Sequence, residues 1–176
     1  MRIGIIGSGM IGGTLARRFA AAGHDVTIGN SRGPDSLAGL VGEIGERAHA
    51  GTAADAAGAG EVVVVAIPTG RYRELPAEAL AGRIVVDANN YYPGRDGAMP
   101  ELDAGTTTSS ELLASSLPGT RVVKAFNTIY FEHLRDQGRP PGTPGRRALP
   151  IAGDDTDAKA TVAALIDDIG FDTYDL

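Results

Sequence analysis

The segment that decides the fold reads Gly7-Ser8-Gly9-Met10-Ile11-Gly12 and directly follows the apolar run Ile3–Ile6. A GxGxxG pattern between a strand and a helix is the arrangement in which a βαβ unit binds a dinucleotide. Gly7 is expected to permit the tight turn, Gly9 to let the backbone approach a pyrophosphate, and Gly12 to allow close packing of helix on strand. The N–H groups at the start of the helix would hold the phosphates.

Runs of β-branched residues alternate with alanine-rich stretches almost from end to end, which predicts repeated βα units. The predicted strands are Arg2–Ile6, Asp25–Ile28, Ala48–Ala50, Glu61–Ile67, Arg83–Asp87, Arg121–Phe126, Ala148–Ala152 and Phe171–Tyr174. The predicted helices are Met10–Ala22, Ser36–Gly45, Thr52–Ala57, Glu74–Ala81, Thr108–Ser115, Ile129–Gln137 and Asp154–Ile169. Residues 1–176 are therefore expected to form a single α/β domain of the Rossmann type. Its sheet would be doubly wound and mainly parallel, with helices on both faces.

Composition excludes several classes of partner. The formal net charge of −6 argues against nucleic acid, whose phosphates need a basic surface. The longest apolar run, Val62–Ile67, is too short to span a membrane, and Arg17-Arg18 interrupts the N-terminal stretch where a signal peptide would lie. The sequence has no cysteine, which excludes disulfides and thiolate metal sites and is compatible with the cytoplasmic location that we expect.

The end of the second predicted strand indicates which dinucleotide is bound. Proteins that bind NAD usually place a carboxylate there, whereas an arginine accommodates the 2′-phosphate of NADP. Here the strand runs into Gly29-Asn30-Ser31-Arg32, with no acid at the tip. Ser31 can donate a hydrogen bond and Arg32 can offer a charge-assisted fork. We therefore predict binding of NADP(H), with Asn30, Ser31 and Arg32 around the adenosine.

The fourth and fifth strands end in Ala66-Ile67-Pro68 and in Asp87-Ala88-Asn89. Ligands in such sheets lie outside the carboxyl ends of the strands, so Ala66, Ile67, Pro68 and Asn89 are expected to flank the ribose and nicotinamide. Tyr91 and Tyr92 follow, and they either stack on a ring or cover the core.

Five segments in order carry a resemblance: GSGMIGG (7–13), GNSRGPDS (29–36), VVVVAIPTG (62–70), VVDANNYYPG (85–94) and VVKAFNT (122–128). Together they resemble the NADPH-dependent reductases of coenzyme F-420, a deazaflavin. The resemblance implies hydride transfer between NADP(H) and F-420, with Ser31 and Arg32 on the 2′-phosphate. It also implies that Ala125 and Asn127, in the Ala-Phe-Asn-Thr turn, border the nicotinamide. Members that we align have histidine at the position of Asn127 and continue past Leu176.

Hydride transfer between two bound rings needs no nucleophile and no metal, so no catalytic side chain and no metal ligand is predicted. His24 and His49 are interpreted as structural, and His133 is a minor candidate for the acceptor side. The alternative functions are NADPH-dependent reduction of a flavin, a quinone or a metal chelate, or a non-catalytic NADPH-sensing module. A hydroxyacid or pyrroline-carboxylate reductase would need a large helical C-terminal domain. A homodimer is expected to enclose the acceptor side.

The stretch GRPPGTPGRR (138–147) predicts neither helix nor strand. It is interpreted as a surface loop or, because Arg139, Arg146 and Arg147 cluster there, as a lid that contacts an anion over the site.

Overall fold

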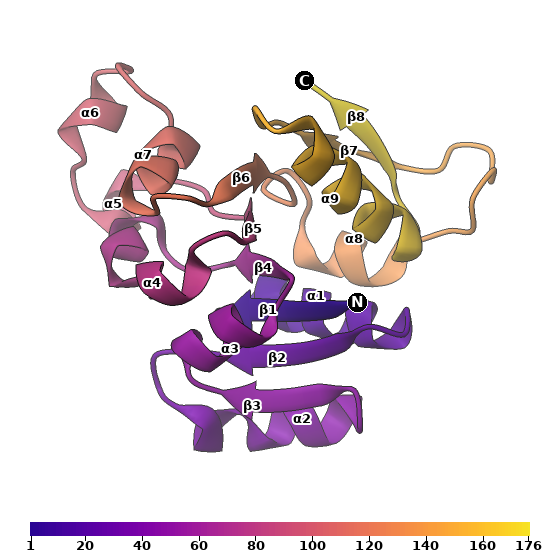
Figure 1. Ribbon diagram of the computed structural model, residues 1–176. Helices are drawn as coiled ribbons and strands as arrows, with labels where there is room; N and C mark the ends of the chain where they lie inside the picture. Colours follow the sequence, from indigo (N-terminus) through magenta and orange to yellow (C-terminus); the bar gives the residue numbers. More distant parts are fainter.

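The computed structural model describes all residues, Met1–Leu176, and its main sheet has six parallel strands (Figure 1). The strands are β1 (Arg2–Ile6), β2 (Asp25–Gly29), β3 (Ala48–Gly51), β4 (Val62–Val65), β5 (Ile84–Asp87) and β6 (Arg121–Lys124). Their order is β3-β2-β1-β4-β5-β6, so the order reverses between β1 and β4. This is the strand order of doubly wound Rossmann folds, and the predicted fold class is confirmed.

Helices cover both faces of this sheet. The α-helices are α1 (Met10–Ala21), α2 (Ala38–Ile44), α3 (Ala53–Ala59), α4 (Ala77–Leu80), α5 (Pro93–Asp96), α6 (Pro100–Asp103), α7 (Ser109–Ser116), α8 (Phe131–Asp136) and α9 (Thr156–Asp168). Two 3₁₀ turns are η1 (Pro34–Leu37) and η2 (Thr69–Glu74). Buried side chains form two clusters, one under α1, α8 and α9 and one under α3, η2, α4 and α7.

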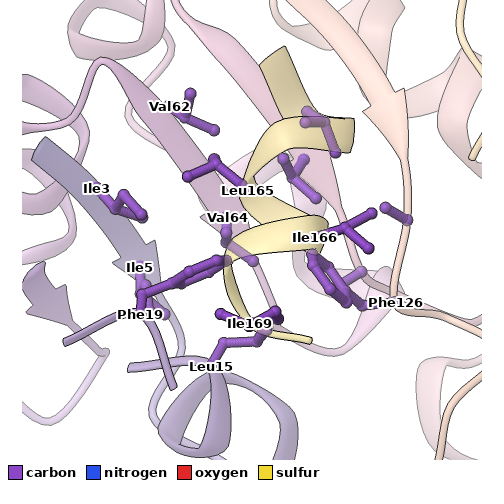
Figure 2. Packing of buried hydrophobic residues seen from close by; sticks show 14 of the residues in the cluster. Ile3, Ile5, Leu15, Phe19, Val62, Val64, Phe126, Leu165, Ile166 and Ile169 are labelled. Atoms are coloured by element: carbon purple, nitrogen blue, oxygen red, sulfur yellow. The ribbon is translucent and has the colours of Figure 1, made fainter. Parts of the chain in front are cut away.

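Successive side chains of a strand point to opposite faces of the sheet, so neighbouring residues of one strand belong to different clusters. Ile3 and Ile5 face the larger cluster, in which Leu165 of α9 lies beside Val62 and Val64 of β4, and Ile166 lies beside Phe126 (Figure 2). Ile6, one residue further along, belongs to the smaller cluster on the opposite face. Burying each such side chain contributes about 1.5–3 kcal/mol. The near-continuous apolar strands thus hold the sheet between two layers, and their carboxyl ends stay in register.

The last two predicted strands do not join the main sheet. β7 (Ala148–Ile151) and β8 (Asp172–Asp175) form a separate two-stranded parallel sheet, which reaches β6 through one antiparallel bridge between Lys124 and Ala152. The predicted helix 74–81 is present but shorter: η2 ends at Glu74, Pro76 is the N-cap of α4, and the helix covers only Ala77–Leu80. The short helices α5 and α6, each beginning at a proline, are additional to the predicted elements.

The arginine-rich stretch 138–147 is a surface loop and not a lid. Arg146 donates hydrogen bonds to Asp167 and Asp172, near the end of α9 and the start of β8. Arg147 bonds Gln137 at the end of α8. The loop extends from the edge opposite the carboxyl ends of the strands (Figure 1). The lid interpretation therefore does not hold. Among the helices, none is both long and apolar enough to cross a bilayer.

Candidate dinucleotide-binding site

Two adjoining clefts open at the carboxyl ends of the strands, where the strand order reverses. The first cleft has a volume of about 390 Å³ and is lined by Ile6, Gly7, Ser8, Gly9, Asn30, Ser31, Arg32, Ala53, Ala66, Ile67, Pro68, Arg71, Glu74 and Leu75. The second has about 500 Å³ and is lined by Gly9, Met10, Ile11, Ala66, Ile67, Pro68, Ala88, Asn89, Asn90, Tyr92, Arg95, Asn127, Thr128, Ile129, Tyr130 and Phe131. Both clefts share Gly9, Ala66, Ile67 and Pro68. Thirteen of the fifteen predicted binding residues therefore line one cleft or both, the exceptions being Gly12 and Ala125.

The glycines of the first turn differ in the space around their α-carbons. A Cβ at Gly7, where φ is +109°, would lie 2.1 Å from the Ala66 carbonyl oxygen, and one at Gly12 would lie 1.9 Å from that of Gly7. Both positions require glycine for packing. A Cβ at Gly9 would meet nothing within 4 Å. The space above Gly9 is thus left open for a ligand that approaches the backbone.

The N-terminus of α1 differs from those of α3, α7 and α9, while α2, which also lacks a side-chain cap, continues directly from η1. The N-cap of α1, Gly9, has no side chain to satisfy the first N–H groups, and no acidic residue lies in the first turn. By contrast, Thr52 and Thr108 cap α3 and α7 through complete capping boxes, and Asp155 caps α9. Unsatisfied N–H groups at the positive end of a helix favour an anion. The arrangement fits a pyrophosphate on α1.

The tip after β2 is organised by Asn30. Its side-chain amide donates to Ser8 Oγ at 2.9 Å and to Ser36 Oγ at 3.0 Å, while its Oδ1 accepts the backbone N–H of Arg32 at 2.8 Å. Asn30 therefore ties the glycine turn to the Ser31–Arg32 tip. The Arg32 side chain makes no hydrogen bond in the structure and lines the first cleft.

Two charged residues that the sequence does not predict complete the first cleft. Arg71 and Glu74 of η2 both line it and form a salt bridge. Hydrogen bonding to Arg71 lowers the pKa of Glu74, so this carboxyl is ionised at neutral pH. The only signal in the sequence is the Arg-x-x-Glu spacing just after the fourth strand. The predicted helix 74–81 conceals that signal, because it separates Glu74 from Arg71.

A buried polar network holds Asn89 and Ile67, which line the second cleft. Asp87, which is 1% exposed, accepts hydrogen bonds from Lys124 Nζ at 3.0 Å and Ser110 Oγ at 2.7 Å. Its other oxygen accepts the Asn89 N–H, and Asn89 Oδ1 in turn accepts the Ile67 N–H at 2.8 Å. A buried carboxylate is tolerated when it is paired and hydrogen-bonded in this way. The network holds the loops after β4 and β5 together, a role for Asp87 that no sequence pattern indicates.

The turn after β6 contains an unusual backbone conformation. Phe126 has φ of +65°, the only positive value outside glycine, and its side chain is buried against Phe19. Such a conformation costs about 1–3 kcal/mol and persists where the surroundings impose it. Here Asn90 donates a hydrogen bond to the Asn127 carbonyl at 2.8 Å, which holds the turn against the loop after β5.

Aromatic and apolar side chains form the rim of the second cleft. Met10, Tyr92 and Tyr130 line it and are exposed by 69%, 54% and 56%. Arg95 lies over the Tyr92 ring at 5.0 Å and donates to the Asn90 carbonyl. Exposed aromatic faces beside a cation suit a planar ligand that carries negative charge.

Several other candidates lie away from both clefts. Ala125 is fully buried, and the Tyr91 hydroxyl donates to Asp103. His24 lies 3.2 Å from Asp168, and His133 contacts Arg147. No group of three His, Cys, Asp or Glu residues is placed to hold a metal ion.

The sheet order, the glycine turn and the uncapped helix together define a nucleotide-binding protein of the Rossmann class. The chain belongs to the family described as NADP oxidoreductase coenzyme F420-dependent, whose model matches residues 2–91. It is therefore a member of a family of NADP-dependent oxidoreductases, and the resemblance inferred from the sequence is confirmed.

Three relatives extend this comparison. A hypothetical protein from Sinorhizobium meliloti is 37% identical with a TM-score of 0.84, and a candidate F420-dependent NADP-reductase from Arthrobacter sp. FB24 is 33% identical with the same score. Both alignments cover 100% of this chain and 84% of the other. The metalloreductase STEAP3 of Rattus norvegicus is 34% identical over 99% of this chain, which spans only 33% of that protein.

Proposed function

We propose that the chain holds NADP(H) across both clefts and passes hydride between it and a deazaflavin of the F-420 type. The observation that carries the proposal is the continuity of the two clefts through Gly9, Ala66, Ile67 and Pro68. A dinucleotide has two ends joined by a pyrophosphate. The uncapped start of α1 lies where the clefts meet, so one such ligand can extend from the first cleft into the second.

The residues have separate tasks in this proposal. Ser31 and Arg32 bind the 2′-phosphate in the first cleft, and Asn30 holds them in place. Residues 7–12 hold the pyrophosphate. In the second cleft, Pro68, Asn89 and Asn127 border the nicotinamide, which supplies or accepts the hydride when bound.

The aromatic rim supports a planar acceptor. Tyr92 and Tyr130 offer faces against which a flat ring can stack. Asp96 engages Nε and Nη2 of Arg95, which leaves Nη1 to donate to an anionic tail. The chain provides alignment and exclusion of water, which is what transfer between two rings requires. The hydride leaves the reduced ring for the oxidised one, and a proton from solvent balances reduction of the deazaflavin.

Cofactor choice is tested by titration calorimetry with NADPH and NADH. We expect NADPH to bind at least tenfold more tightly, a difference of about 1.4 kcal/mol. Arg32→Ala should remove the preference and leave NADH binding nearly unchanged, because only the 2′-phosphate contact is lost. Equal affinities in the unmodified protein would refute the roles of Ser31 and Arg32.

The acceptor is tested by following the absorbance of oxidised F-420 in the presence of NADPH and the protein. Bleaching of F-420 supports the proposal. The second candidate is reduction of a flavin, quinone or metal chelate, which the similarity to a metalloreductase over 99% of the chain favours. Consumption of one of these acceptors, with F-420 untouched, would establish that candidate instead.

A further inference from the structure

Arg71 lies across the first cleft from the Ser31–Arg32 tip. Its Nη1 is 3.4 Å from Ser31 Oγ, a long hydrogen bond that joins segments 40 residues apart in the sequence. Its other two nitrogens are engaged by one carboxylate: Nε and Nη2 both donate to Glu74. Glu74 therefore binds the Nε and Nη2 edge of the guanidinium. Nη1 remains directed at Ser31, which we assign to the 2′-phosphate.

The backbone that carries Arg71 is firmly placed. A Cβ at Gly70 would lie 2.6 Å from the Asp96 carbonyl oxygen, so η2 packs closely on α5, and Tyr72 is 6% exposed. The Arg71 side chain itself is 45% exposed and free to meet a ligand. Arg73, on the same 3₁₀ turn, instead covers the Tyr72 ring at 5.1 Å and does not line the cleft.

The first cleft has one more positive charge than negative charge near the Arg71–Glu74 pair. Arg32 and Arg71 supply two positive charges, and Glu74 supplies one negative charge that is already paired. A guanidinium can serve two anions at once, because its five N–H donors point in different directions. If Arg71 were removed, Glu74 would become a bare carboxylate beside the phosphate position, and like charges repel.

We propose that Arg71 is a second specificity-determining residue for the 2′-phosphate, and that Glu74 is the positioning residue that directs it. The inference rests on the proposed binding of NADP(H) in the first cleft. It adds an electrostatic contact from η2 that the sequence motif at the β2 tip does not contain.

The test compares two ligands that differ by one phosphate, 2′,5′-ADP and 5′-AMP. Affinities are measured for the unmodified protein, for Arg71→Gln, for the double variant with Glu74→Gln, and for Arg73→Gln as the matched control. Thermal unfolding shows whether each variant is folded. We expect the unmodified protein and Arg73→Gln to prefer 2′,5′-ADP at least tenfold, and Arg71→Gln to lose most of that ratio.

Removing the uncompensated carboxylate should restore part of the loss. The double variant is expected to bind 2′,5′-ADP about threefold more tightly than Arg71→Gln, and no recovery would overturn the repulsion that we assign to an unpaired Glu74. Glu74→Gln alone should weaken the preference for 2′,5′-ADP, and an unchanged preference would overturn its positioning role. A ratio in Arg71→Gln that matches Arg73→Gln would overturn the role of Arg71 alone. A ratio near one in the unmodified protein would instead contradict the proposed cofactor, so the two failures are distinguishable.

Discussion

The two clefts adjoin each other but are built differently. In the first, the polar and charged side chains are tied to one another by specific bonds: Asn30 to Ser8, and Arg71 to both Glu74 and Ser31. The second has a rim of exposed aromatic and apolar side chains, and Asn89, which lines it, is held by the buried Asp87. One cleft is suited to recognise charge at fixed points, the other to accept a flat surface.

This contrast leads us to expect that the first cleft selects its ligand by charge and that the second selects its ligand by shape. Fixed donors around an anion discriminate strongly, because a ligand without the phosphate leaves charged groups unpaired. Stacking against aromatic faces tolerates related rings, because every flat ring offers a π-surface. We therefore expect strict choice of cofactor and broader choice of acceptor.

The largest expected effect is a loss of NADPH affinity on substitution of Gly9, which lies where the two clefts meet. The stability of the fold should change little. Gly9→Ala places a methyl group in open space, so the free energy of unfolding should change by no more than about 0.5 kcal/mol. NADPH affinity should fall at least a hundredfold, because the methyl group blocks the approach of the pyrophosphate. Calorimetry and chemical denaturation measure the two quantities.

Gly12→Ala is the companion variant. Its Cβ would collide with the Gly7 carbonyl oxygen, so it should lower stability as well as affinity. If Gly9→Ala bound NADPH normally, the pyrophosphate would not pass over Gly9.

An intermediate effect is expected from the aromatic rim. Replacing both Tyr92 and Tyr130 by alanine should slow reduction of the acceptor about tenfold and change NADPH affinity less than twofold, because the adenosine half is untouched. Stopped-flow absorbance and calorimetry give the two values. Tyr174→Ala on β8, similarly exposed but away from both clefts, is the control. A parallel loss of NADPH binding would show that the two clefts do not act separately.

The smallest effect comes from a helix that has its own cap. Thr108→Ala removes the hydroxyl that accepts the Glu111 N–H at the start of α7, which should cost about 1 kcal/mol of unfolding free energy. NADPH affinity should not change, because this helix end is already satisfied and needs no ligand. A drop in affinity as large as that of Arg32→Ala would contradict the distinction between capped and uncapped helices.

Much of the first cleft is predictable because its parts are close in the sequence. A strand, a tight glycine turn and a helix start imply one another through backbone geometry, so the roles of Gly7 to Gly12 follow from the order of residues alone. The Ser31–Arg32 tip follows from the next strand in the same way. Arg71 is not predictable on these grounds, because it lies in a 3₁₀ turn that the sequence does not predict and that contacts Ser31, 40 residues earlier in the chain.

By itself, the sequence determined the fold class, the glycine turn and the absence of an acid at the β2 tip. Each of these depends on local backbone preferences or on the periodicity of apolar residues, which a single chain displays directly. Only the tertiary structure decided that Asp87 pairs with Lys124, that Glu74 and Arg71 form an ion pair beside Ser31, and that the arginine-rich loop lies at the opposite edge. Those contacts join residues whose separation in space depends on how whole layers pack, and no short stretch of sequence records that distance.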